Sequence, residues 1–452
     1  MQSNTEYLAA SGLPATLAEA ISEAVRTQPA DPVDFIGSYL LQSKAKSSPL
    51  ADEEARKREK PMVDGPRAVT LALELYGLKV VPGSLKDLDS YDDRNFYIKA
   101  THTRPELADE ADGNLIETAG SMGGHFVFKV HNGVESLNAG FVECQNLAMA
   151  AVRSSGIWCP RALPSLDGSL IAFAPHSLAD GTSRQHAIRC LPFKPASLMG
   201  GVLPTEGLLA QVGVLCAKVS RALSQIDHPA AHRIFVWDLA QTLECRPLLA
   251  HLSAERQQLI GSVLDEFEAR VLPRAPALRT CVIHGDINDQ NVLVSEPTSA
   301  GGERSVVGVI DFGDMCHTWL VNEVAIAAAY AVIALHYERP KGEPTPAEQP
   351  SLGEVEACVA MVTSYAAHMS AEGHGLSDVE WHVLPTLIAC RIAMSLCIGA
   401  YSSAQDPTNE YLQLTLLPGL HALRALRATS ADDLMRALKA GPKAGSNRPS
   451  WM

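Results

Sequence analysis

Residues 281–294 read CVIHGDINDQNVLV and residues 305–314 read SVVGVIDFGD, and the rest of the chain can be placed around these two stretches. Both contain short runs of β-branched residues, which are typical of buried strands. Polar residues interrupt or directly follow these runs at His284, Asp286, Asn291 and Asp311. A loop at the end of a strand can direct such side chains towards a ligand. We therefore expect a binding or catalytic site at these positions.

This set of side chains suits phosphoryl transfer. The reaction needs a carboxylate that orients or deprotonates the acceptor hydroxyl, together with an amide and a second carboxylate that hold Mg²⁺ against nucleotide phosphates. Asp286 and Asn291 keep the five-residue interval of the protein-kinase catalytic loop, and Asp-Phe-Gly follows at 311–313. Because His-Gly-Asp replaces His-Arg-Asp, the stretch resembles the aminoglycoside phosphotransferase and choline kinase families. That resemblance implies Asp286 as catalytic base, with Asn291 and Asp311 as metal ligands.

Composition limits the classes of protein to consider. The chain has 452 residues, of which 46% are hydrophobic and 19% charged, as expected for a soluble protein with a large core and about two or three domains. Its formal net charge of −14 argues against recruitment to nucleic acid or to an anionic membrane. The longest apolar stretch, Val324 to Leu335, is shorter than the about 20 residues that span a bilayer, so we expect a buried helix there.

The N-terminus and the cysteines indicate a cytoplasmic protein. The first residues, MQSNTEYLAASG, lack a basic segment followed by an apolar core, so no secretory signal is predicted. The ten cysteines include no Cys-x-x-Cys pair and most lie in apolar settings. We therefore expect reduced core cysteines rather than disulfides or a zinc site.

Residues 5–43 are expected to form a separate helical hairpin. Apolar residues recur at helical spacing from Leu17 to Val25, Gln28-Pro29-Ala30 breaks the pattern, and Pro32 can begin a second helix. Two helices this short cannot bury their apolar faces alone, which favours self-association. A hairpin that packs on its own catalytic domain is the alternative.

The sequence LPATLAEAISEAVRTQPADPVDFIGSYLLQSK, at 13–44, resembles the dumpy-thirty type dimerisation and docking motif. Members of that family form a four-helix dimer with an apolar groove for an amphipathic helix, and they occur in chromatin methyltransferase assemblies and ciliary radial spokes. The resemblance implies a homodimer, a docking partner with an amphipathic helix, and a location at the ciliary axoneme. Residues 44–62 are charged and poor in apolar residues, which predicts a linker that is partly helical at most.

The turn SYDDRN, at 90–95, lies between two strand-like runs. In phosphotransferases a turn at this point covers the nucleotide phosphates with backbone N–H groups. We therefore predict that Asp93 and Asn95 bind the nucleotide. The turn lacks the glycines of the protein-kinase loop, so the assignment rests on order along the chain, and a plain hairpin turn is the alternative.

Lys129 lies within the apolar strand pattern HFVFKV at 125–130. A lysine suits a buried strand only where its ammonium meets an anion. The expected anions are nucleotide phosphates and a carboxylate from the following helix. We predict Glu143 as that carboxylate, with Glu135 as its rival, and a lysine that reaches the surface is the alternative.

Six segments, in order between residues 63 and 423, resemble the hydroxylysine kinase family of the aminoglycoside phosphotransferase superfamily: SYDDRNF, FKV, VECQN, WDL, HGDINDQNVLV and VIDFGDM. That family is similar in fold to protein kinases and transfers phosphate from GTP to the hydroxyl of 5-hydroxy-L-lysine. The resemblance implies a two-lobed α+β fold, with an antiparallel-sheet N-lobe at 63–193 and a mainly helical C-lobe at 194–430. It also implies a Mg²⁺ ion, GTP or ATP as co-substrate, and Lys129 as the phosphate anchor. Residues 431–452 are predicted to be a disordered tail.

An acceptor with two amines and a carboxylate needs carboxylates for its ammonium groups and a cation or N–H for its own carboxylate. Asp289, Asp314 and Asp238 are predicted to contact it, and for Asp238 an ion pair with a loop arginine is the alternative. Arg391 lies in an apolar helical pattern, where an unpaired charge would be costly. We predict that Arg391 binds the substrate carboxylate or serves as a structural anchor. Glu323 is a further available acid, or a cap of its own helix.

The sequence therefore predicts a phosphotransferase that acts on an alcohol group of a small amino-acid-like acceptor, with 5-hydroxy-L-lysine as the first candidate. Two alternatives remain. A docking or adaptor protein of a ciliary or chromatin assembly could carry a kinase-like domain, and a kinase for choline or ethanolamine fits the motifs as well.

Overall fold

The computed structural model describes residues 49–104, 122–137, 139–177, 181–297, 303–337, 352–405 and 415–442. The hairpin expected at residues 5–43 lies outside these ranges. The chain divides into two compact units, residues 1–55 and residues 56–452. Of the first unit the structure describes residues 49–55, where helix α4 (Pro49–Arg58) begins. The second unit contains both lobes of the fold.

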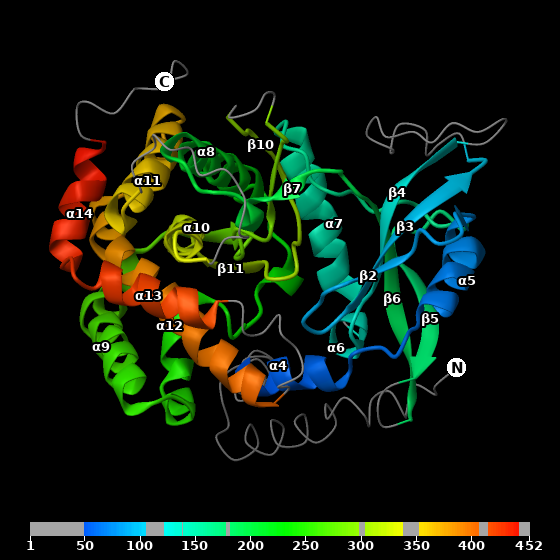
Figure 1. The fold of residues 1–452 in the computed structure, drawn as a ribbon, viewed down its shortest axis with the longest axis horizontal. Helices are drawn as coiled ribbons and strands as arrows, with labels where there is room; N and C mark the ends of the chain where they lie inside the picture. The colour runs from blue at the N-terminus through cyan, green and yellow to red at the C-terminus, as the bar shows by residue number, and fades with distance from the viewer. Residues whose placement is uncertain are drawn as a thin grey trace, which may run out of the picture. The chain divides into compact units, whose positions relative to one another are not determined.

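The N-lobe is built on a six-stranded antiparallel sheet in the order β1-β3-β4-β6-β5, with β2 paired to β3 (Figure 1). The strands are β1 (Lys79–Val80), β2 (Lys86–Leu88), β3 (Arg94–His102), β4 (Met122–Val130), β5 (Ala172–Ser177) and β6 (Ser183–Pro192). The register places Asn95 opposite Lys129, and Lys129 opposite Arg189. Directly opposed residues point to the same face of a sheet. Three polar side chains therefore lie in a row on one face of the N-lobe sheet.

Helices cover both faces of this sheet: α5 (Gly65–Tyr76), α6 (Gly133–Leu137) and α7 (Ala139–Ser154). Two neighbouring residues of β6 face opposite sides of the sheet. Ile188 belongs to the apolar cluster that contains residues of α5, and Ala187 packs with Val142 of α7. Figure 1 shows α5 and α7 on opposite sides of the sheet. Tyr76 at the end of α5 donates a hydrogen bond to the carbonyl of Ile188 at 3.0 Å.

The C-lobe is mainly helical, with α8 (Glu206–Leu223), α9 (Ala254–Arg270), α10 (Val321–Ala334), α11 (Glu354–Ala371), α12 (Asp378–Gln405), α13 (Leu416–Leu426) and α14 (Ala431–Ala440). Short 3₁₀ helices occur at Met199–Gly201, Pro229–Ala231, Leu239–Cys245, Pro247–His251 and Leu272–Ala277. Every residue of α10 is buried, as expected for the apolar stretch there. Figure 1 shows α10 end-on between α8, α11 and α12.

Two small sheets of the C-lobe carry the polar loops. One pairs β8 (Thr280–Ile283) with β11 (Cys316–Trp319), and the other joins β7 (Ser197–Leu198), β9 (Val292–Val294) and β10 (Val306–Val309). All of these pairs are antiparallel. The polar loop after β8 leads into β9 and the loop after β10 leads into β11, so both loops connect the two small sheets.

One prediction at the end of the catalytic unit is corrected. Residues 431–440, expected in a disordered tail, form α14, because Leu434 and Leu438 are buried and Ser430 caps the helix by accepting the N–H of Asp433. The linker expected at 44–62 contains α4, in agreement with a partly helical segment, and its end makes specific contacts that are described below.

Helix α12 is long and apolar enough to span a bilayer by length and composition. However, 89% of its most apolar window is buried within the protein, as in the core helix of a soluble domain. It also contains the buried Arg391 and an internal proline, Pro385. We therefore treat α12 as a core helix of the C-lobe.

The close approach of α8 and α11 can be tested at Gly213. A Cβ at Gly213 would lie 2.2 Å from the carbonyl oxygen of Met361 on α11. We expect Gly213→Ala to lower the free energy of unfolding by about 1–3 kcal/mol, because the two helices must move apart. Gly207→Ala, in the first turn of the same helix, meets nothing within 4 Å and should be neutral or stabilising. Chemical denaturation measures both, and equal effects would contradict the close packing.

Candidate active site

The loop after β8 presents Asp286 through a tightly held backbone. Gly285 adopts φ 78°, and a Cβ there would lie 2.7 Å from the carbonyl oxygen of Asp314, so glycine is required. The buried carboxylate of Glu323 accepts the backbone N–H of His284 at 2.6 Å and that of Gly285 at 3.1 Å. Burial raises the pKa of Glu323 to about 7. Glu323 thus holds the loop, a role that sequence reasoning missed although it noted the acid.

The ring of His284 connects this loop to the segment before Asp311. Its Nε2 lies 3.2 Å from the carbonyl oxygen of Ile310, and its Nδ1 accepts the backbone N–H of Asp286 at 3.3 Å. Burial lowers the pKa of His284 to about 4, so the ring is neutral at physiological pH. Both bonds then require the tautomer with its proton on Nε2.

The carboxylate of Asp286 accepts three hydrogen bonds. Its Oδ1 accepts Arg391 Nη2 at 2.9 Å, and its Oδ2 accepts the amide groups of Asn288 at 2.9 Å and Asn291 at 2.8 Å. A carboxylate offers about four lone-pair positions. The remaining position is on Oδ1, where a substrate hydroxyl can donate. Burial raises the pKa of Asp286, while the Arg391 guanidinium counteracts that rise.

Arg391 reaches Asp286 from within α12. Its side chain is 1% exposed, and its Nη1 donates to the carbonyl oxygen of Trp237 at 2.8 Å. The guanidinium also lies 5.1 Å from the centre of the Trp237 ring and 5.4 Å from that of Tyr330. The sequence predicts that Arg391 binds the substrate carboxylate or serves as a structural anchor. Its contacts in the structure are those of an anchor for Asp286.

Asp311 has the one positive φ among the non-glycine residues that the structure describes, at 62°. Such backbone strain persists where the surroundings enforce it and is common at functional sites. Its Oδ1 accepts the N–H of Gly313 at 3.1 Å, and the half-exposed carboxylate lies 4.0 Å from the ammonium of Lys129. The strained turn therefore aims Asp311 towards the N-lobe lysine.

Arg233 supports the turn after Asp311, and sequence reasoning missed it. Its Nη2 donates to the carbonyl of Gly313 at 2.6 Å and its Nε to that of Met315 at 3.1 Å. Its guanidinium lies 4.0 Å from the centre of the Phe141 ring and 4.1 Å from that of Phe235. An arginine beside the apolar run Ile-Phe-Val-Trp was the available signal.

The ion-pair partners of Lys129 differ from the prediction. Its ammonium lies 2.8 Å from the Asp93 carboxylate. Although burial opposes ionisation of both groups, their mutual attraction lowers the pKa of Asp93 and raises that of Lys129. Glu143 is exposed on α7, because its helical neighbours Val142 and Cys144 face the core. The predicted pairing of Lys129 with Glu143 is thus replaced by one with Asp93.

Asn95 and Glu135 also lie near Lys129. Asn95 is its cross-strand neighbour, with a buried Oδ1 that has no hydrogen-bond partner among the described residues. Glu135 bonds Arg56 at 3.2 Å and His131 at 3.0 Å. The structure thus gathers Asp93, Asn95 and Lys129, three residues predicted to bind the nucleotide, on one wall.

The buried side chains of Asp93, His131 and Glu135 lie close enough together to hold a metal ion. However, Asp93 already pairs with Lys129, and Glu135 with Arg56. A divalent cation at this point would meet these positive charges at short range. We therefore treat the cluster as a charge network.

Three predicted acceptor contacts have different environments. Asp238 caps the helix Leu239–Cys245 by accepting the N–H of Ala240, and it bonds Thr318 at 2.8 Å and Asn322 at 3.2 Å. These bonds account for the position of Asp238 without a substrate contact and without the predicted ion pair with a loop arginine. Asp289 is 1% exposed, and burial raises its pKa to about 6. Burial and the neighbouring Asp286 raise the pKa of the partly exposed Asp314 to about 8.

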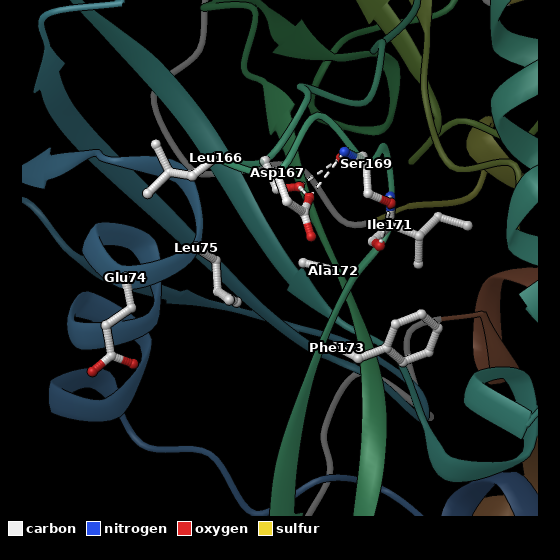
Figure 2. Close-up of a pocket in the computed structure, with 9 residues that line it drawn as sticks. Glu74, Leu75, Leu166, Asp167, Ser169, Ile171, Ala172 and Phe173 are labelled. Carbon is white, nitrogen blue, oxygen red and sulfur yellow. Dashed lines mark hydrogen bonds between the residues drawn. The ribbon is translucent and has the colours of Figure 1, made fainter.

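A separate cavity of about 480 Å³ lies in the N-lobe between α5, β5 and residues 165–171 (Figure 2). Figure 2 shows apolar side chains around it, including Leu75, Leu166 and Phe173. Its one aspartate, Asp167, bonds the Ser169 backbone at 3.0 Å. The cavity contains none of the residues described above, so it does not belong to the active site.

The phosphotransferase enzyme family model matches residues 115–342, half of the chain. The chain belongs to that family. Relatives named hydroxylysine kinase are 28% identical over 386 residues in Danio rerio, covering 84% of this chain and 96% of the relative, and 26% identical over 375 residues in Mus musculus, covering 81% and 90%. A second model, the Dpy-30 motif, matches residues 3–45. The predicted resemblances and the phosphotransferase class with an alcohol acceptor are confirmed.

Solved structures confirm the two-lobed fold. A microcompartment-associated aminopropanol kinase superposes with a TM-score of 0.53 at 18% identity and covers 83% of this chain and all of that one. The amicoumacin kinase hAmiN, solved with AMP-PNP, Ca²⁺ and Ami, has a TM-score of 0.53 at 12% identity and covers 84% and 96%. At these identities the likeness concerns the fold.

The contact between Arg391 and Asp286 predicts a pH effect. If Asp286 is the base that the sequence predicts, it must be ionised to accept a proton, and turnover rises with pH through its pKa. A charge-assisted hydrogen bond contributes about 1.5–3 kcal/mol, so Arg391→Met should raise that pKa and move the acid limb up by about one to two pH units. Arg391→Lys should shift it less, because a positive charge remains.

A kcat profile from about pH 5 to 9 measures this shift. Asp314→Asn is the control, because Asp314, with a pKa of about 8, is still protonated where Asp286 titrates. It should leave the acid limb in place even if turnover changes. An unshifted limb in Arg391→Met would contradict the role given to the ion pair.

Proposed function

We propose that the chain transfers the terminal phosphate of GTP or ATP to a hydroxyl of an amino-acid-like acceptor, with 5-hydroxy-L-lysine as the first candidate. The observation that carries this proposal is the carboxylate of Asp286. Three of its lone-pair positions are fixed by Arg391, Asn288 and Asn291, and one on Oδ1 remains for a hydroxyl donor.

In this reaction the acceptor oxygen forms a bond to the γ-phosphorus while the bond to the β–γ bridging oxygen breaks. The hydroxyl proton passes to Oδ1 of Asp286, and the electron pair of the broken bond stays on the nucleoside diphosphate. Lys129 offers its ammonium to the nucleotide phosphates from the N-lobe. A bound phosphate then either replaces Asp93 as the partner of Lys129 or lies beside Asp93 as a second anion.

Asn291 and Asp311 have the donor atoms that Mg²⁺ prefers, which are oxygens. Asn291 gives its Nδ2 to Asp286, at the carboxylate and at the backbone carbonyl, and this orientation leaves Oδ1 for an ion. The Asp311 carboxylate is half exposed on its strained turn. When bound, Mg²⁺ supplies positive charge that stabilises the phosphoryl group in transfer.

Support for an amine-bearing acceptor comes from the acids beside Asp286 and from the relatives. Asp314 is partly exposed next to Gly285, and its carboxyl gains a favourable partner when a substrate ammonium approaches. The similar proteins of Danio rerio and Mus musculus are named hydroxylysine kinases. Choline or ethanolamine would satisfy the same acids, which makes them the competing acceptors.

The reaction can be tested with Asp286→Asn and a panel of amino alcohols. Purified protein is mixed with GTP or ATP, Mg²⁺ and one acceptor, and phosphate transfer is followed. We expect 5-hydroxy-L-lysine to be the best acceptor, and we expect Asp286→Asn to retain nucleotide binding while turnover falls by about 10²–10⁴-fold. Asp238→Asn, which changes a helix cap, is the matched control and should keep turnover within a few-fold. Transfer to none of the acceptors would instead favour an adaptor role.

We further propose that residues 5–43 form a homodimer that docks an amphipathic helix, in the cytoplasm and at the ciliary axoneme. The Dpy-30 motif at residues 3–45 supports this proposal, and it also keeps open an adaptor role beside catalysis. The axonemal location rests on the predicted resemblance alone.

Dimer formation is tested by light scattering of the full chain. Ile21→Glu and Leu40→Glu place charges on the two apolar helical stripes expected in the motif. We expect the wild type at twice the monomer mass and the doubly substituted chain at the monomer mass, with phosphate transfer unchanged. Ser22→Glu, between apolar positions, is the control. A dimer that survives the double substitution would disprove assembly through this motif.

A further inference from the structure

A basic segment at the start of the catalytic unit holds the turn beside the nucleotide wall. We define this strap as Arg56–Lys60, RKREK, and the turn as Ser90–Asp93. Lys60 Nζ donates to the Ser90 carbonyl at 2.8 Å, Lys57 Nζ lies 4.2 Å from the centre of the Tyr91 ring, and Arg56 Nη1 lies 3.5 Å from Asp92 Oδ2. Three basic side chains thus contact three consecutive residues of the turn.

The turn Ser90–Asp93 also fixes the position of Lys129. Ser90 Oγ accepts the N–H of Asp93 at 3.1 Å, which closes the turn on itself. The Asp93 carboxylate holds Lys129 Nζ at 2.8 Å and accepts both the backbone and the side-chain N–H of Asn132. A displaced turn would therefore displace Asp93 and with it the lysine that faces the nucleotide phosphates.

The strap is itself fixed to the helix that follows the lysine strand. The N–H of Gly133, at the start of α6, donates to the Glu59 carbonyl at 2.9 Å, and Arg56 bonds Glu135 at 3.2 Å. A Cβ at Gly133 would lie 2.9 Å from Glu59 Cβ, so the two backbones meet closely. The side chain of Arg56 is only 6% exposed, which makes its ion pairs less subject to screening than those of a surface arginine.

The strap also reaches the C-lobe. Lys57 Nζ donates to Ser402 Oγ on α12 at 2.8 Å, and the Tyr91 hydroxyl lies 2.5 Å from the same Ser402 oxygen. Arg56 lies 4.9 Å from the centre of the Phe235 ring. One serine of the catalytic lobe thus contacts both the strap and the turn, and the turn is supported from both lobes.

We propose that the strap Arg56–Lys60 is part of the nucleotide site, where it positions the turn Ser90–Asp93 over the phosphates. The inference rests on the proposed function, because it takes the nucleotide as the ligand of this wall. The strap residues act through the turn and Asp93 and are positioning residues. The segment predicted as a simple linker therefore ends in a support for nucleotide binding.

The test uses the full-length chain and fluorescent, non-hydrolysable analogues of GTP and ATP. The double variant Lys57→Met/Lys60→Met removes two contacts to the turn, and we expect its dissociation constant for the bound analogue to rise by about ten-fold or more. Lys57→Arg keeps a cation over Tyr91 and should remain near the wild type. Lys79→Met, at an exposed lysine of the same sheet, is the matched control with no more than a two-fold change.

Two further readouts separate positioning from general damage. Hydrogen exchange of residues 88–96 without nucleotide should become faster in the double variant, while exchange of α10 and the thermal midpoint remain unchanged. The KM for the acceptor should also remain unchanged. Tyr91→Phe removes the hydroxyl contact to Ser402 and keeps the ring beside Lys57, so it should weaken nucleotide binding less than the double variant.

The outcomes distinguish the two proposals. If the wild type binds neither analogue, the proposed function fails and the strap role fails with it. If the wild type binds nucleotide but the double variant binds it equally well, with unchanged exchange at 88–96, the strap role alone is overturned. Equal losses in nucleotide and acceptor binding together with a lower thermal midpoint would likewise overturn it, since they indicate a general effect on folding.

Discussion

The ion pair between Arg391 and Asp286 is the contact on which the catalytic lobe depends. Burying a guanidinium in an apolar helix is costly unless its charge is paired, and removing one partner of such a pair costs about 3–5 kcal/mol. Arg391 meets this requirement through Asp286 and the Trp237 carbonyl, between two aromatic rings. The same bond ties α12 to the catalytic loop. The residue that makes the core helix unusual thus also orients the Asp286 carboxylate and counteracts the rise of its pKa on burial.

The N-lobe contains a larger network of charged side chains. Its buried network contains the carboxylates of Asp93 and Glu135 and the cations of Lys129, Arg56 and Arg189. His131 adds no charge, because burial lowers its pKa. Asp92 and Asp311 add two carboxylates at its edge, 3.5 Å from Arg56 and 4.0 Å from Lys129. The cations of the network therefore already have anionic partners, and a phosphate that binds Lys129 must compete with Asp93 or join it.

Spacing along the chain was enough to predict the catalytic loop, because Asp286, Asn291 and Asp311 take their positions from neighbouring strands. The lysine in an apolar strand was predictable for the same reason. The ion-pair partner of Lys129 was not predictable in this way. Only the folded structure shows that Asp93 contacts the lysine and that Glu143 is exposed. Contacts across the chain, such as those of Glu323 and Arg233, depend on tertiary packing and leave a weak local signal.

The turn Ser90–Asp93 contains no glycine, and this bears on the proposed role of the strap Arg56–Lys60. In the protein-kinase loop, glycines let the backbone approach the phosphates closely. Here each residue from Ser90 to Asp93 carries a side chain, so its backbone is less free than that of a glycine-rich loop. The side chains supply those contacts, because Tyr91, Asp92 and Asp93 each bond a residue outside the turn. Such a turn has less backbone freedom than a glycine-rich loop and is held in one conformation by its side-chain contacts. Its position then depends on the segments that make those contacts.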